Sequence, residues 1–191
     1  MKLYDWSIAP NPKRVRMYLA EKGIDVDREE AAEPGKPVLK PEYLEKFPHR
    51  RVPLLELDDG TTIGEAMAIC RYFETLHSDP PLMGIDALDK AIVEMWERIS
   101  EAEGMFVAAE VFRNSKRSFA GRALPGYVEP IEQIPELVER GKLRMAQYYV
   151  KIDGRLAGRD FITGDRFTVA DITAFGVIEL AKFCELDIPE T

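Results

Sequence analysis

The sequence lacks most of the features that mark secreted and membrane-spanning proteins. It contains only two cysteines, Cys70 and Cys184, and both fall in apolar helical patterns. We expect them to be reduced core residues, as in a cytoplasmic protein, rather than a disulfide pair. We expect no cleavable leader, and no apolar run reaches the roughly 18 residues of a transmembrane helix. The sequence therefore predicts no membrane association.

Positive charge and histidine are also scarce. The 34 acidic residues outnumber the 26 lysines and arginines, which gives a formal net charge of −8. This balance argues against nucleic acid as the main partner, although "KRVR" and "HRR" are locally basic. The two histidines, His49 and His77, have no Cys/His ligand spacing around them, so we expect no metal site.

The chain does contain enough apolar residues for a packed core, at 46% of the 191 residues. Up to His77, strand patterns alternate with helix patterns, which predicts a βαβ-ββα unit. The expected strands are 2–6, 24–31 and a hairpin of 54–57 with 61–63, and the expected helices are 12–22, 41–47 and 65–76, with a proline-containing loop over 32–41.

One of these helices begins in the stretch "SIAPNPKRVR", residues 7–16. Asn11 followed by Pro12 predicts the helix start, because an Asn side chain accepts a bond from an orphan backbone N–H. Proline at the first helical position loses no hydrogen bond. The charged residues of this helix, including Arg14 and Arg16, are expected largely outside its apolar face.

After the stretch "HSDPPLMGID" the chain reads as helix throughout. Residues 114–135 are expected to form a loop or a broken helix, and residues 136–156 another helix. The predicted fold class is α/β plus all-α. A βαβ-ββα domain over 1–78 is joined by a linker, 79–85, to a helical bundle over 86–191.

Two helix starts in the second half carry side-chain caps. Asp86 and Asp89 can cap a long helix, and Thr168 with Asp171 forms an S/T-x-x-D capping box for the last helix. The capping box is the clearest helix start in the sequence.

Three stretches together resemble the cytosolic glutathione transferase superfamily, in the manner of a bacterial-type member. They cover nearly the whole chain in the right order and read "APNPKRVRMYLAEKGI", "FPHRRVPLLELDDGTTIGEAMAICRYFE" and "FITGDRFTVADITAF". The resemblance implies a thioredoxin-like N-terminal domain, an all-helical C-terminal domain, a homodimer and a role in detoxification. Because the chain stops soon after the helix that "TVAD" caps, we expect a final helical segment to be absent.

The resemblance also implies where glutathione binds. In the family Pro53 is cis, which turns the backbone of Val52 outward to pair with the cysteinyl part of the ligand. Backbone N–H groups at the start of the helix that follows Glu65 suit the γ-glutamyl carboxylate, and Glu65 suits the ammonium. Ala66 stands where the family usually has Ser or Thr, so a hydroxyl contact worth about 1 kcal/mol is lost.

The glycine carboxylate of glutathione needs a cation. Arg50 lies where some classes of the family place a histidine. Lys40, His49 and Arg51 are near enough in sequence to take the same role. Apart from the resemblance, "HRR" equally suits a solvated loop.

The implied reaction is attack by the glutathione thiolate on a small hydrophobic electrophile. A free thiol has a pKa of about 8.5, so the protein must stabilise the thiolate. Ala9 falls where several classes of the family have a thiol-activating Ser or Cys, and it has no side-chain donor. We favour Asn11 as the donor, with Ser7 second, while Tyr4 is expected in the core. A helix N-terminus with a bound water is an alternative.

The predicted function is that of a glutathione transferase, with two alternatives. One is a non-catalytic module of the same fold that binds glutathione or a protein, which the absent hydroxyls at Ala9 and Ala66 favour. The other is a glutathione-dependent lyase, isomerase or dehalogenase. The residues expected to line the electrophile site are Ile8, Phe106, Phe112 and Tyr127.

Overall fold

The computed structural model describes residues 1–33 and 38–186. The chain forms two compact units, residues 1–80 and 81–191. In the first unit helices pack on a sheet, and the second unit is helical. The predicted fold class, α/β plus all-α, is therefore confirmed. Within the described ranges, no helix combines the length and the apolar character needed to cross a membrane.

The first unit is built on a four-stranded mixed sheet with the order β2-β1-β3-β4. Strand β1 pairs in parallel with β2 and antiparallel with β3, and β3 and β4 form the predicted hairpin. The strands are β1 (Lys2–Asp5), β2 (Asp27–Glu30), β3 (Leu54–Glu56) and β4 (Thr62–Gly64). The second strand is shorter than the expected 24–31, because only four residues find partners on β1.

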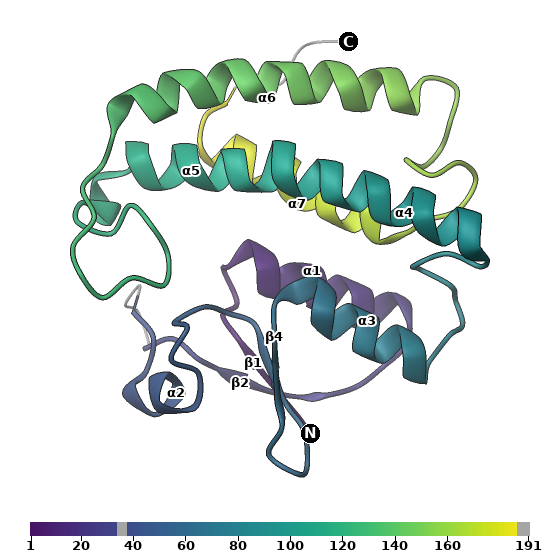
Figure 1. The fold of residues 1–191 in the computed structure, drawn as a ribbon, viewed down its shortest axis with the longest axis horizontal. Helices are drawn as coiled ribbons and strands as arrows, with labels where there is room; N and C mark the ends of the chain where they lie inside the picture. The colour runs from purple at the N-terminus through teal and green to yellow at the C-terminus, as the bar shows by residue number, and fades with distance from the viewer. Residues whose placement is uncertain (34–37, 187–191) are drawn as a thin grey trace. The chain divides into compact units, whose positions relative to one another are not determined.

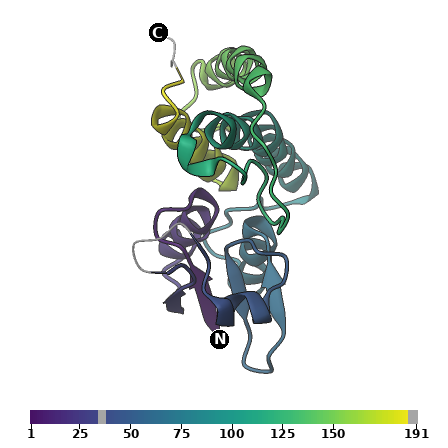
Figure 2. The same cartoon turned by 90° about the vertical axis from the view of Figure 1, so that its left-hand side faces the viewer.

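Helices cover both faces of this sheet. They are α1 (Pro10–Glu21), α2 (Pro41–Lys46) and α3 (Ala66–Leu76). Helices α1 and α3 lie side by side on one face (Figures 1 and 2). On the other face, Tyr43 of α2 forms a core cluster with Tyr4 of β1 and Leu54 of β3. Tyr4 is therefore in the core, as expected, and its hydroxyl donates a hydrogen bond to Glu56.

Helix α1 starts earlier than the sequence predicted. Its first residue is Pro10, and Ala9 is the N-cap, with an extended backbone and no capping side chain. The Ala9 carbonyl accepts the Lys13 N–H at 3.3 Å. The prediction of Asn11 as the cap and Pro12 as the first helical residue is therefore wrong. Of the two prolines, Pro10 occupies the first position, which needs no N–H, and Asn11 lies inside the first turn.

The loop expected over 32–41 is only partly described, since residues 34–37 lie outside the described ranges. Ala32 and Leu39 on either side of them form an antiparallel bridge. The unit ends near the cis peptide bond Asp79–Pro80. There Lys22 Nζ donates to the carbonyl of Pro80 at 2.6 Å.

The second unit contains the predicted long helix, in three consecutive segments. These are α4 (Ala87–Ile99), a π-helical turn (Ser100–Met105) and α5 (Phe106–Ser115). A 3-10 turn (Arg117–Phe119) and a loop follow, so the expectation over 114–135 holds. The remaining helices are α6 (Pro135–Leu156), which runs alongside α5 (Figure 1), and α7 (Val169–Phe183).

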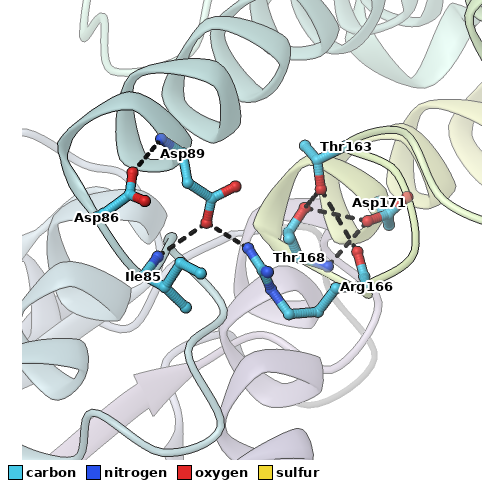
Figure 3. Close-up of polar contacts among 7 residues, drawn as sticks. All are labelled: Ile85, Asp86, Asp89, Thr163, Arg166, Thr168 and Asp171. Carbon is cyan, nitrogen blue, oxygen red and sulfur yellow. Dashed lines mark hydrogen bonds and ion pairs between the residues drawn. The ribbon is translucent and has the colours of Figure 1, made fainter.

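The start of α7 is built as the capping box predicts. The Asp171 carboxylate accepts hydrogen bonds from the backbone N–H groups of Thr168 and Ile162, both at 2.8 Å. Beside this box, Arg166 forms an ion pair with Asp89 in the first turn of α4 (Figure 3). The same Asp89 carboxylate accepts the Ile85 N–H at 2.8 Å. The two helix starts are thus joined through side chains.

The N-cap of α4 is also as predicted. Asp86 accepts the backbone N–H of Asp89 at 2.9 Å (Figure 3). Both cysteines of the chain are free and buried, which confirms the expectation of reduced core residues.

Candidate functional site

The candidate site lies in the first unit, where the loop before β3 meets the start of α3. The Val52–Pro53 peptide bond is cis, as the family resemblance implied. One residue earlier, Arg51 Nη1 lies 3.6 Å from Oε1 of Glu65. This ion pair places the "VP" segment beside the first turn of α3.

Glu65 itself has an unusual backbone. It is the N-cap of α3 with φ +65° and ψ 128°, in the left-handed region that non-glycine residues seldom adopt. Its carbonyl accepts the Ile69 N–H at 3.1 Å, so the helix proper begins at Ala66. The N–H groups of the first turn have no partner inside a helix and lie at its positive end. They form a place for an anionic group.

Arg50, the residue expected to hold the glycine carboxylate, also has a positive φ, +57°. Its backbone N–H donates to the Phe47 carbonyl at 3.1 Å, which closes the turn that carries "HRR". Of the competing cations, Arg51 forms the ion pair with Glu65. Lys40 is the N-cap residue of α2, and His49 packs edge-on against Phe47. The structure thus brings Arg51, Val52, Pro53 and Glu65 together.

The segment Ser7–Ala9 connects β1 to α1 and is held by three charged side chains. The Ser7 N–H donates to the Glu30 carboxylate at 3.2 Å, and the Ser7 carbonyl accepts Arg16 Nη2 at 2.9 Å. Arg16 also forms an ion pair with Asp5, at the end of β1. The backbone of this loop is therefore fixed, while the Ser7 residue remains exposed.

Asn11 is the residue of the α1 start that retains donors. Pro10 and Pro12 have no N–H, and the Ala9 N–H donates to the Trp6 carbonyl at 2.9 Å. Asn11 keeps its own backbone N–H and a side-chain amide, and it is half-buried. Among residues 1–33 and 38–186, no group accepts a hydrogen bond from either of these donors. Its Oδ1 accepts a hydrogen bond from Arg14 Nη1 at 3.1 Å.

Sequence reasoning missed Arg14 as a buried residue. It was expected outside the apolar face of the helix, yet it is 1% exposed. The sequence spacing could have indicated this burial, because Arg14 lies four residues before Tyr18, a core residue of the same helix, and residues four apart share one side of a helix. The "KRVR" stretch is consequently not a free basic patch, since Arg16 is also paired with Asp5.

The residues expected to line an electrophile site belong to different units. Ile8, in the first unit, is 81% exposed. In the second unit Phe106 and Tyr127 are more than half exposed, whereas Phe112 packs against Phe119 and Phe183 with ring centroids 4.8 and 5.5 Å away. Phe112 is therefore part of an aromatic cluster within its own unit.

Comparison with known proteins identifies the family. Residues 3–81 match the model of the glutathione S-transferase N-terminal domain, and residues 135–190 match that of the C-terminal domain. Glutathione S-transferase 2 of Saccharomyces cerevisiae is 33% identical over 203 residues, which cover 100% of this chain and 80% of that protein.

Solved structures give the same result. A glutathione S-transferase domain-containing protein of Marinobacter aquaeolei VT8 has a TM-score of 0.86 and 34% identity, covering 99% of this chain and 90% of that chain. A glutathione S-transferase of class Gtt2 from Vibrio parahaemolyticus has a TM-score of 0.78 and 36% identity, covering 95% of this chain and 82% of that chain. The chain belongs to the glutathione S-transferase family. The predicted superfamily, transferase class and glutathione co-substrate are thereby confirmed.

Proposed function

We propose that this glutathione S-transferase holds glutathione along residues 50–53 and the start of α3, and adds its thiolate to a small hydrophobic electrophile. The observation that carries this proposal is the 3.6 Å ion pair between Arg51 and Glu65. This ion pair supports the proposal because it joins the backbone segment that we expect to pair with the cysteinyl part to the helix start that we expect to bind the γ-glutamyl end.

Each end of glutathione has a matching group in this arrangement. The γ-glutamyl carboxylate accepts the N–H groups of the first turn of α3, including that of Ala66, and the neighbouring ammonium pairs with Glu65. The backbone of Val52 pairs with the cysteinyl part in the manner of an added strand. Arg50 takes the glycine carboxylate, with Lys40, His49 and Arg51 as the competing cations.

The thiol lies at the start of α1 in this proposal. Ala9 has no side-chain donor, so the thiolate accepts the amide of Asn11, with the backbone N–H of the same residue beside it. A donor that bonds only the charged form lowers the pKa of the thiol. The positive end of α1 acts in the same direction. Ser7 is the second choice, and a water held at the helix start is the third.

We further propose that the protein acts in the cytoplasm in detoxification and as a homodimer. The support for a dimer is an apolar row on α4, in which Leu88 and Met95 are 72% and 49% exposed and Ile92 lies between them. These residues recur at steps of four and three, so they lie on one face of the helix. Sedimentation velocity should give twice the mass of one chain, and Leu88→Glu should reduce that mass to a single chain.

The function is tested by retention on immobilised glutathione, followed by assays with aryl halides, peroxides, disulfides and β-ethers. We expect glutathione-dependent turnover of at least one class. Asn11→Ala should lower kcat/KM about tenfold or more near neutral pH, the scale of losing a thiolate donor, whereas Ser7→Ala should have little effect. Because the lost bond favours the charged form, the deficit should shrink as pH rises above the thiol pKa.

Two results would contradict this assignment. Retention without turnover of any substrate class would favour the non-catalytic module. Unchanged kcat/KM in both variants would remove Asn11 and Ser7 as thiolate donors and leave the helix start with its water.

A further inference from the structure

We propose that Arg14 is a positioning residue that orients the side-chain amide of Asn11 so that its NH2 group, and not its oxygen, faces the glutathione thiolate. This inference rests on the proposed function, in which Asn11 is the thiolate donor. It starts from one contact, the hydrogen bond from Arg14 Nη1 to Asn11 Oδ1 at 3.1 Å.

The chemistry of the two groups fixes the orientation of the amide. A guanidinium has only donors, so the end of the Asn11 amide that faces Arg14 must be the oxygen. The NH2 group is then on the opposite side of the same planar group. A half-turn of the amide would place the NH2 group against the guanidinium and the oxygen against the thiolate, and both contacts would be repulsive.

The buried position of Arg14 stabilises this orientation of the Asn11 amide. Arg14 lies one helical turn after Asn11 on α1 and is 1% exposed, so its guanidinium is held by the core of the unit. Asn11 is half-buried, and its NH2 group has no acceptor among the described residues. Arg14 therefore leaves the NH2 group of Asn11 on the side of the amide that faces away from the guanidinium.

Arg14 also brings a positive charge to the start of α1, and this effect must be separated from orientation. A charge effect on the thiolate would act whether or not Asn11 has an amide. An orienting effect requires the amide. A double-mutant cycle between the two residues therefore distinguishes them.

The experiment measures the pKa of the thiol of bound glutathione, by ultraviolet absorbance of the thiolate, together with the pH profile of kcat/KM. The variants are Asn11→Ala, Arg14→Met and the double variant. Asn11→Ala and Arg14→Met should each raise the thiol pKa and lower kcat/KM about tenfold near neutral pH. In the Asn11→Ala background, Arg14→Met should change kcat/KM less than twofold.

Two further variants guard against misfolding, because Arg14 is buried. Asn11→Asp keeps an acceptor for Arg14 but has no side-chain donor, so it should fold at least as stably as the parent and still raise the thiol pKa. Arg14→Lys keeps a donor-only partner for Oδ1 and should recover most of the activity that Arg14→Met loses. Lys13→Met, which removes a neighbouring charge from the same helix, should alter kcat/KM less than twofold.

The outcomes separate the two proposals. A normal thiol pKa in Asn11→Ala would overturn the role of Asn11 in the proposed function. A raised pKa in Asn11→Ala, with an equal further rise when Arg14→Met is added, would leave that role intact and overturn the orienting role of Arg14. A normal thiol pKa in Asn11→Asp would also overturn the orienting role of Arg14. It would show that an oxygen beside the thiolate stabilises it as well as the NH2 group does.

Discussion

The guanidinium of Arg51 lies 3.6 Å from the carboxylate of Glu65, across the loop before β3 and the start of α3. Their side chains are 52% and 68% exposed, so water screens the pair and its contribution to stability is only about 0–1 kcal/mol. The carboxylate is consequently available to a cationic group of a ligand at little cost to the fold.

The first prediction concerns this carboxylate. Glu65→Gln removes the charge that pairs with the ammonium of glutathione, and a hydrogen bond to a charged group contributes about 1.5–3 kcal/mol. The Kd for glutathione measured by calorimetry should rise tenfold or more, with little change in Tm. Glu21→Gln, an exposed carboxylate at the end of α1, is the matched control and should leave Kd unchanged. An unaltered Kd in Glu65→Gln would remove Glu65 from the binding site.

The second prediction concerns the capping box of α7. Asp171 accepts the N–H groups of Thr168 and Ile162, and its removal would leave both donors without this acceptor. Asp171→Ala should lower the free energy of unfolding by about 2 kcal/mol, the sum of a lost cap and a lost loop contact. Urea unfolding followed by circular dichroism measures this loss.

Asp165 provides the control for this variant. It lies in the same loop before α7 and is exposed. Asp165→Ala should change the free energy of unfolding by less than about 0.5 kcal/mol, as is usual for surface substitutions. Equal losses in the two variants would show that the loop, and not the capping box, is the sensitive feature.

The third prediction compares two glycines of α6. A Cβ on Gly141 would overlap the side chain of Val111 on α5, whereas a Cβ on Gly154 would meet no atom within 4 Å. Gly141→Ala should therefore destabilise the protein by about 1–3 kcal/mol through overpacking. Gly154→Ala should stabilise it by up to about 1 kcal/mol, because alanine has the higher helix propensity. Stabilisation by both changes would show that α5 and α6 have room to separate.

Much of the fold followed from local patterns. The hairpin was predictable because Asp59 and Gly60 form the turn, with Gly60 at φ +84° and the Asp59 carboxylate accepting the Thr61 N–H. The capping box at Thr168 was predictable for the same reason, since its contacts span only a few residues. Such features depend on neighbours in sequence, which periodicity and turn chemistry describe well.

Other features depend on contacts that sequence patterns do not describe. The start of α1 was misplaced because two prolines compete for the first position, and Pro10 occupies it. The π-helical turn at Ser100–Met105 has no local signature, and Gly104 within it lies against Val177 of α7. In the candidate site, the motifs predicted the candidate residues. The pairing of Arg51 with Glu65 and of Arg14 with Asn11 depends on side-chain conformations that the motifs do not determine.

The last prediction concerns the thiols of Cys70 and Cys184, which must be distinguished from the thiol of the co-substrate glutathione. Cys70 is fully buried and Cys184 is 8% exposed, and burial raises the pKa of the Cys184 thiol to about 11. Since only the thiolate is reactive, and Cys184 is almost wholly protonated at pH 7, a disulfide reagent should release almost no colour from the native protein over minutes. In denaturant the same reagent should react with both thiols of each chain.

The raised pKa of Cys184 also determines how little of this thiol ionises between pH 7 and pH 9. Raising the pH from 7 to 9 ionises most of a free thiol with a pKa of about 8.5, but only about 1% of a thiol with a pKa near 11. Thiolate absorbance that appears in this range in the presence of glutathione should therefore come from glutathione, and Cys184→Ala should not change it. Rapid labelling of the native protein at pH 7, abolished in Cys184→Ala, would instead show that Cys184 becomes accessible and reacts as a thiolate.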